Sequence, residues 1–248
     1  MNRHWQKIQA IAQLKLHMII HNLSISFIPA FSMLMVYLLR LIIHDQSTAA
    51  DAASAMGGAY LLSFGLLFNT VMVGIMMCSG PLAEEKEKHT LRVLMTASVS
   101  GLDFFIGSAL PVLVIIEVVN VLMIPIAGVA WSVIPWGSFL LISTICALIS
   151  MLLGYMTGIL SKNQTQAGIV SMPLLLIFTM LPFFRVLNHT LEMLANLTYS
   201  GILTRLVDQT LDQGYHWDFQ DIAVLLIWLV IGVGLFLYAY RRNGLDSD

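Results

Sequence analysis

Charged residues are scarce in this sequence. Asp, Glu, Lys and Arg make up 10% of the 248 residues, and hydrophobic residues make up 58%; charged residues are about a quarter of an ordinary soluble domain. The mean hydropathy is +0.84. A soluble fold could not cover this much apolar surface without large exposed patches. The shortage of charge therefore excludes the soluble classes and indicates a protein whose solvent is partly lipid.

Other signals are also missing. The two cysteines, Cys78 and Cys146, lie inside apolar runs, as small buried or lipid-facing side chains do, rather than as a disulfide or metal pair. The net charge is −2, and no basic patch alternates with aromatic residues, so no nucleic-acid partner is expected. The histidines lack the spacing of metal ligands. We expect neither a metal site nor a cofactor bound by this chain.

Long apolar runs dominate what is present. A membrane-spanning helix needs roughly 20 apolar residues, and because lipid cannot satisfy backbone polar groups, such runs must be helices. The runs do not alternate as the strands of a β-barrel would. We predict an all-α membrane protein, a single six-span domain over residues 1–248, with spans at about 23–43, 58–78, 103–127, 136–160, 167–187 and 221–240.

Lys and Arg are distributed unequally between the two sides of these spans. An even number of spans places both termini on one side. That side holds Arg3, Lys7, Lys15, Lys86, Lys88, Arg92, Lys162, Arg241 and Arg242, whereas the other holds Arg40, Arg185 and Arg205. Because cytoplasmic loops are enriched in Lys and Arg, both termini are predicted to be cytoplasmic.

Two segments outside the spans have helical patterns. Apolar residues recur at helical spacing from Trp5 to Ile19, which predicts an amphipathic interfacial helix over about 4–18; the alternative is that this segment simply begins the first span. The outer segment 188–220 carries recurring leucines and a break near Ser200. It predicts one or two short re-entrant helices, that is, helices that fold back toward the membrane.

The densest charge cluster follows the second span. Seven of the nine residues from Glu84 to Arg92 are charged or titratable. Ser79-Gly80-Pro81 resembles a helix start, and Glu84 precedes Lys88 by four residues, the favourable order for an ion pair. An apolar stripe follows these charges, so we predict a cytoplasmic helix over 81–97. From these patterns alone it either fixes topology or docks a cytoplasmic partner.

Glu117 is the carboxylate that lies well inside a predicted span. Charged groups in membranes are costly and are functional candidates by default. It either lines a cavity or is a neutral acid hydrogen-bonded to Asn120 or Asn69; we favour the second interpretation because no second intramembrane carboxylate forms a relay with it.

The spacing Gly154-x-x-x-Gly158 permits close helix approach and supports packing or dimerisation.

The charge cluster also carries a family resemblance. The run Glu84-Glu85-Lys86-Glu87-Lys88-His89-Thr90-Leu91, with the turn at 98–100, resembles the signature between spans two and three of type-2 ABC-exporter permeases. His89 stands where that family usually has Gly, and Ala97-Ser98 replaces its common Ser-Pro. Asn196-Leu-Thr-Tyr199 is similar to the family's outer-gate Asn-Pro-Leu-Thr-Tyr, without its Pro.

The resemblance implies a function and a set of sites. The helix over 81–97 would be a coupling helix that contacts a cytoplasmic ABC ATPase subunit and carries its nucleotide-driven movement into the spans. The implied contact residues are Glu84, Glu85, Lys86, Glu87, Lys88, Thr90 and Leu91. Asn196 and Tyr199 are the implied outer-gate residues. ATP and Mg would be bound by the partner, since this chain lacks a Gly-x-x-x-x-Gly-Lys-Ser/Thr loop.

The expected protein is a permease subunit in a bacterial plasma membrane. Two copies, or this chain and a paralogue, would pair around a path between their second, fifth and last spans and export an apolar or amphipathic peptide, drug or lipid-like molecule. A long anionic polysaccharide fits less well, because no basic or aromatic track is evident in the sequence. The alternatives are a secondary transporter that uses Glu117 and an intramembrane enzyme; the latter is disfavoured because Glu84 and Glu85 lie outside the bilayer.

Overall fold

The computed structural model describes residues 2–46, 51–88, 100–212 and 214–242, and within these ranges the chain is helical and contains no strand. Short 3₁₀- or π-helical segments interrupt or join the α-helices. In chain order the elements are α1 (Asn2–His21), α2 (Leu23–Gln46), α3 (Asp51–Leu67), η1 (Phe68–Val73), α4 (Gly74–Glu87), α6 (Gly101–Ala127), η2 (Trp131–Val133), α7 (Trp136–Leu160), α8 (Gln164–Phe183), η3 (Phe184–Leu187), α9 (His189–Ala195), α10 (Tyr199–Asp212) and α11 (Phe219–Arg242).

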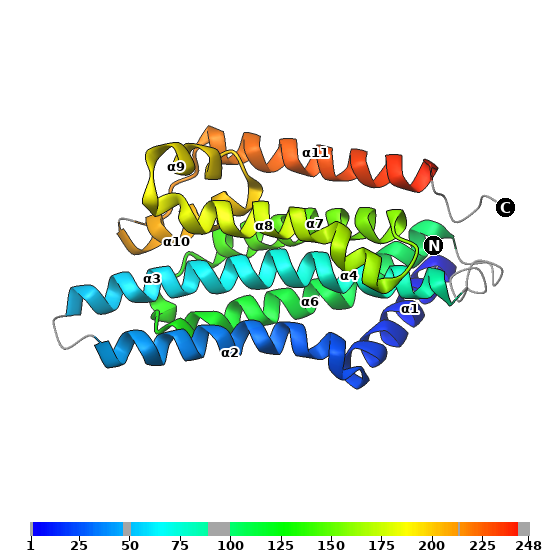
Figure 1. Ribbon diagram of the computed structural model, residues 1–248, viewed down its shortest axis with the longest axis horizontal. Coiled ribbons are helices and arrows are strands. Elements are labelled where there is room, and N and C mark those ends of the chain that lie inside the picture. The colour runs from blue at the N-terminus through cyan, green and yellow to red at the C-terminus, as the bar shows by residue number, and fades with distance from the viewer. Residues whose placement is uncertain (1, 47–50, 89–99, 213, 243–248) are drawn as a thin grey trace.

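Six helices in the described ranges are long and apolar enough to cross a membrane, which confirms the predicted fold class. They are Ile25–Ile43, Gly57–Glu87, Gly101–Ala127, Trp136–Leu160, Gln164–Leu187 and Phe219–Arg242. These helices run roughly alongside one another, and the end of α11 lies at the same end of the bundle as α1 (Figure 1). The placement of this end in the cytoplasm stays a prediction from the Lys and Arg distribution.

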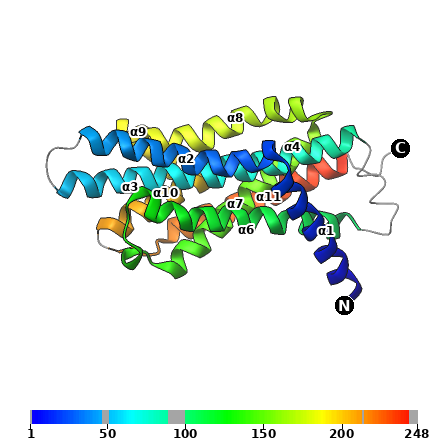
Figure 2. The ribbon, with the colours of Figure 1, turned by 90° about the horizontal axis from the view of Figure 1, so that it is seen from below.

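The N-terminal segment is a helix separate from the first span. Its last residue is His21, and α2 begins at Leu23. Figure 2 shows α1 leaving the axis of α2 at a steep angle and crossing the start of α6. Gly107 of α6 makes this crossing possible, because a Cβ at that position would lie 2.8 Å from Cβ of Ile11. The alternative of one continuous first span is therefore wrong, and the interfacial location of α1 stays a prediction.

The second span is the most buried of the six and packs most extensively against α7. Glycines make this contact possible: an added Cβ at Gly154 would lie 2.5 Å from the carbonyl oxygen of Ile75, and one at Gly158 would lie 2.8 Å from that of Ser79. The Gly154-x-x-x-Gly158 face is thus used inside the chain, by α4 against α7. The small-residue pattern therefore serves helix packing within one chain.

The predicted helix start at Ser79-Gly80-Pro81 is wrong. Helix α4 runs unbroken from Gly74 to Glu87 with Pro81 inside it. A proline inside a spanning helix is tolerated where neighbouring helices support the backbone, and Gly158 of α7 packs against Ser79 and Leu82, on both sides of Pro81. The charge cluster therefore begins as the end of the second span and not as a new helix. The rest of the predicted 81–97 helix, residues 89–97, lies outside the described residues.

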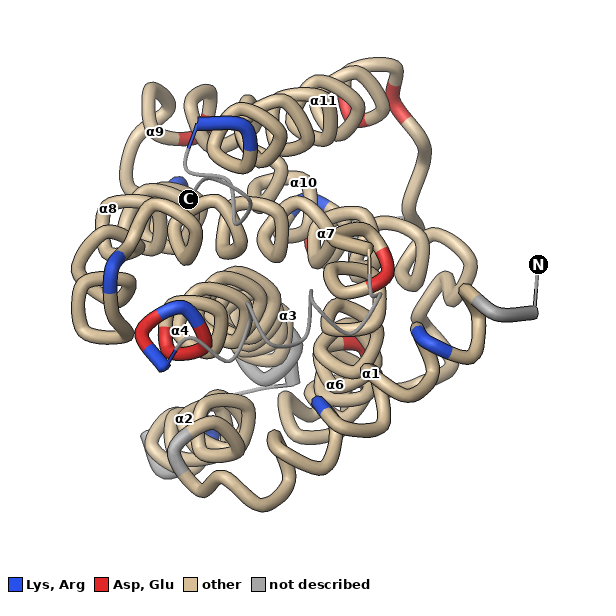
Figure 3. Tube along the Cα trace, turned by 90° about the vertical axis from the view of Figure 1, so that its right-hand side faces the viewer, with Lys and Arg blue, Asp and Glu red and all other residues tan. Residues whose placement is uncertain are grey.

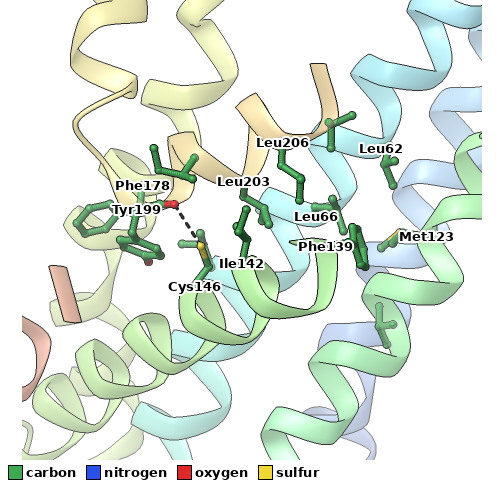
Figure 4. Packing of buried hydrophobic residues seen from close by; sticks show 14 of the residues in the cluster. Leu62, Leu66, Met123, Phe139, Ile142, Cys146, Phe178, Tyr199, Leu203 and Leu206 are labelled. Carbon is green, nitrogen blue, oxygen red and sulfur yellow. Dashed lines mark hydrogen bonds between the residues drawn. The ribbon is translucent and has the colours of Figure 1, made fainter. Parts of the chain in front are cut away.

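The outer segment contains two helices, α9 and α10. Residues Ile202, Leu203 and Leu206 of α10 are almost completely buried, in a cluster shared with α3 and α7 (Figure 4). A second apolar cluster, at the other end of the bundle, joins α4, α6, α7 and α11. The folded-back α10 is thus part of the core.

Candidate functional site

The charged end of α4 has an outer face and an inner face. Figure 3 views the bundle from this end, with acidic and basic residues around the tip of α4. Glu87 and Lys88 are exposed, and Lys88 Nζ donates a hydrogen bond to Glu84. This bond raises the pKa of the Lys88 ammonium, so Lys88 stays charged at neutral pH. Glu84, Glu87 and Lys88 form the outer face.

The inner face consists of Glu85 and Lys86. Glu85 is 7% exposed and accepts a hydrogen bond from Lys15 Nζ of α1. Lys86 Nζ donates to the carbonyl oxygens of Ile159 and Ser161, where α7 ends and its carbonyls lack helical partners. Two residues of the implied contact set are therefore engaged within the chain. Thr90 and Leu91 lie outside the described residues.

The middle of the second span contains a π-helix, η1, which the sequence analysis did not predict. Asn69 Nδ2 donates to Asn120 Oδ1 at 2.8 Å and to the carbonyl oxygen of Ile116 at 3.0 Å, and Asn120 Nδ2 donates to Thr70 Oγ1 at 3.0 Å. All three polar side chains are buried. π-Helical turns often mark functional sites. The sequence signal for this network is that Asn69, Thr70 and Asn120 are polar residues within two otherwise apolar runs.

Glu117 lies one helical turn from this network but does not join it. Its Oε2 accepts a hydrogen bond of 2.7 Å from Ser143 Oγ of α7. The predicted partners of Glu117, Asn120 and Asn69, bond to each other instead, because Asn69 of η1 faces α6 and Asn120 of α6 faces η1 rather than α7. The expectation of an interhelical hydrogen bond is confirmed, but the partner is different.

Tyr199 begins α10 and is fully buried. Its hydroxyl lies 2.9 Å from Ser150 Oγ, and its carbonyl oxygen accepts a hydrogen bond from the Cys146 thiol, drawn as the dashed line in Figure 4. Ser150 lies past the midpoint of α7. The α9–α10 corner therefore reaches deep into the bundle from the end where α7 begins.

Asn196 lies on the other side of this corner. It lines a cavity of about 820 Å³ between α3, η3, α9 and α10, whose walls include both charged and apolar side chains. Arg185 of η3 donates to Thr204 and forms an ion pair of 2.5 Å with Asp208, both on α10. Sequence patterns do not bring these residues together, because they contact each other only when α10 folds back.

A second ionic network joins α10 to the last span. Arg205 Nη1 lies 2.9 Å from Oδ1 of Asp221, and the Tyr215 hydroxyl donates to Oδ2 of the same carboxylate at 3.0 Å. Burial, followed by the neighbouring Asp221 charge, raises the pKa of Tyr215, which keeps its proton available for this bond. Together with the Arg185–Asp208 pair, these contacts tie α10 to η3 and α11.

Aromatic rings follow one side of the second span. Ring centroids of neighbouring residues lie 5.3–6.2 Å apart along this series, which runs from α2 over η1 and α3 to the end of α8: Phe31, Phe68, Phe64, Phe183 and Tyr60. All five are partly or largely exposed. We name them the aromatic row. This row is not evident in the sequence, because three separate segments contribute to it.

Two comparisons with known proteins bear on this chain. Residues 1–189 match the family model described as ABC-2 type transporter. Among proteins with curated descriptions, none matches the chain.

Proposed function

We propose that this chain, which belongs to the ABC-2 type transporter family of membrane subunits, is the permease of an ATP-driven exporter. The family implies an associated ABC ATPase subunit, and the six apolar helices fit a multi-pass protein of the plasma membrane. Beyond this, we infer that two permease copies pair and export an apolar or amphipathic molecule. ATP and Mg belong to the ATPase in this proposal.

The unbroken helix from η1 to Glu87 is the observation that carries the coupling part of the proposal. Because α4 has no break at Pro81, a force applied to its charged tip reaches the middle of the second span through one rigid element. Glu84, Glu87 and Lys88 point outward there, whereas Glu85 and Lys86 face the bundle. The outer face of α4 is thus the part of the cluster that fits an ATPase contact.

The aromatic row supports the transport path. Its rings are at least partly exposed along the second span, between α2 and the end of α8, and ring faces attract both apolar and cationic groups. This fits cargo that is apolar or amphipathic. An aromatic surface can also stack against sugar rings. The lack of an aromatic track in the sequence is therefore no longer an argument against a saccharide cargo.

Co-purification tests the coupling proposal. The chain is co-expressed with candidate ATPase subunits and purified on a tag that it alone carries. Wild type should retain an ATPase in a fixed ratio, and the double charge reversal Glu87→Lys with Lys88→Glu should weaken retention. Glu192→Lys, a single charge reversal at an exposed carboxylate on α9, is the control and should retain the partner. Equal retention by all three would refute the assignment of the outer face.

A further inference from the structure

Helix α1 contacts both helices that flank the cytoplasmic segment. Lys15 bonds to Glu85 in the last turn of α4. His4 Nδ1 lies 3.1 Å from Oδ2 of Asp103 in the first turn of α6. The end of α4 and the start of α6 are thus both bonded to one helix, although α1 is far from each in sequence.

The Lys15–Glu85 contact is secluded from solvent. Lys15 is 8% exposed and Glu85 7%, and Nζ of Lys15 lies 5.1 Å from the ring centroid of Phe104 on α6. Burying two charges costs desolvation, which their mutual attraction offsets only while both are present, so removing one partner of a buried ion pair is destabilising. The ring adds a cation–π attraction that a neutral side chain would lack. The ammonium group of Lys15 therefore contacts both α4, through Glu85, and α6, through Phe104.

Packing fixes α1 on α6 independently of this ion pair. Ile8 and Ile11 of α1 are buried, and a Cβ at Gly107 of α6 would lie 3.0 Å from the carbonyl oxygen of Ile8. The contact between α1 and α4, in contrast, includes few close backbone approaches. Removing the Lys15 charge should consequently leave α1 seated on α6 and free the end of α4 from α1, while α4 stays packed on α7.

We propose that Lys15 is a positioning residue for energy coupling. Helix α1, seated on α6 by packing and bonded to α4 by Lys15, sets the distance between the end of α4 and the start of α6. Movement imposed on either of these helix ends would then displace α1, α4 and α6 together. This inference rests on the proposed function for its role in coupling, but its geometry concerns this chain alone.

A distance measurement tests the geometry without an ATPase. Nitroxide labels on cysteines at the exposed positions Glu87 and Leu102 report the spacing of the two helix ends, in a background with Cys78→Ala and Cys146→Ala. Lys15→Met keeps the apolar stem but removes the charge and should broaden the distance distribution. Lys15→Arg keeps the charge and the ring contact and should restore it. Gln13→Glu, on the exposed face of α1, is the matched control and should match wild type.

Two results would overturn the proposal. One is a Lys15→Met distribution identical to wild type; the other is equal broadening by Gln13→Glu. In the purified ATPase complex, Lys15→Met should lower the permease-dependent ATP hydrolysis rate severalfold while the subunit ratio is unchanged, and Lys15→Arg should restore the rate. If the wild-type chain retains no ATPase, the proposed function fails, whereas the distance measurement still decides whether Lys15 positions the helix ends.

Discussion

At the scale of single residues, neighbouring charges in one cluster have opposite environments. Glu85 and Lys86 bond to α1 and to the end of α7, whereas Glu87 and Lys88 are exposed. The reason is the 100° turn between successive helical residues, which follows from 3.6 residues per turn. Residue type therefore predicts a charged surface here, but only the rotation of α4 decides which charges remain available to a partner.

Tyr199→Phe tests the deep contact of the α9–α10 corner. The change removes one hydroxyl and leaves Ser150 Oγ buried without that partner, which should cost about 1–2 kcal/mol of stability. The melting temperature of the protein in detergent should fall. Tyr37→Phe, at a half-exposed position of α2, is the control and should leave it unchanged. An unchanged melting temperature for Tyr199→Phe would show that this hydrogen bond contributes nothing.

Glu117→Gln separates the structural from the transport interpretation of the intramembrane carboxylate. The glutamine carbonyl can still accept the bond from Ser143, so we expect ATP-dependent transport of an amphipathic dye to be unchanged. Glu117→Leu removes the acceptor and should lower stability instead. Loss of a proton-gradient-driven activity in Glu117→Gln would contradict this and favour a secondary transporter.

At the scale of elements, glycine positions decide how closely helices approach. Gly154 and Gly158 let α7 touch the backbone of α4, whereas an added Cβ at Gly234 would meet no heavy atom within 4 Å in the part of the chain that the structure describes. Glycines in two different spans thus have different structural roles. The π-helix η1 is the other decisive element, since it directs Asn69 toward α6.

Gly154→Ala should disrupt the contact between α4 and α7. Its Cβ would overlap the Ile75 backbone, which cannot move without displacing the second span, so overpacking should cost about 1–3 kcal/mol or more. The yield of monodisperse protein in size-exclusion chromatography is the measurement. Gly234→Ala has room and should behave as wild type. Normal yield and melting temperature for Gly154→Ala would mean that the helices can separate at little cost.

At the scale of the whole molecule, spans two and four are the centre of the bundle. Their apolar windows are the most buried, whereas the first, fifth and last spans are largely exposed. Exposed apolar surface is expected where lipid or a second subunit covers it. The aromatic row follows the central second span between two exposed ones, a position that fits the proposed path between paired subunits.

Replacing a ring of the row tests this path. Phe68→Ala should weaken ATP-dependent efflux of an amphipathic dye by about 2- to 10-fold in apparent affinity, because aromatic pairs contribute roughly 0.5–1.5 kcal/mol. Phe68→Trp keeps a ring face and should retain efflux. Phe219→Ala removes an exposed ring outside the row and serves as the control. Equal effects of the two alanine variants would remove the row from the path.

Much of the architecture was predictable from the residues. Six apolar runs must be helices, because lipid offers no partners for backbone polar groups, and the six predicted spans agree with the structure apart from their ends. The second span is the main exception. A Ser-Gly-Pro signal indicated a break at Pro81, but close packing between α4 and α7 overrides this local preference.

The sequence by itself determined a six-span helical membrane protein with a charge cluster after its second span, because length, hydropathy and charge are properties of local segments. Only the tertiary structure decided that Glu85 faces Lys15, that Glu117 bonds to Ser143, and that Tyr199 reaches Ser150. These contacts join residues 26 to 70 positions apart. They depend on how each helix is rotated about its axis and on how closely helices approach. A run of apolar residues does not determine this rotation, because many rotations bury a similar apolar area.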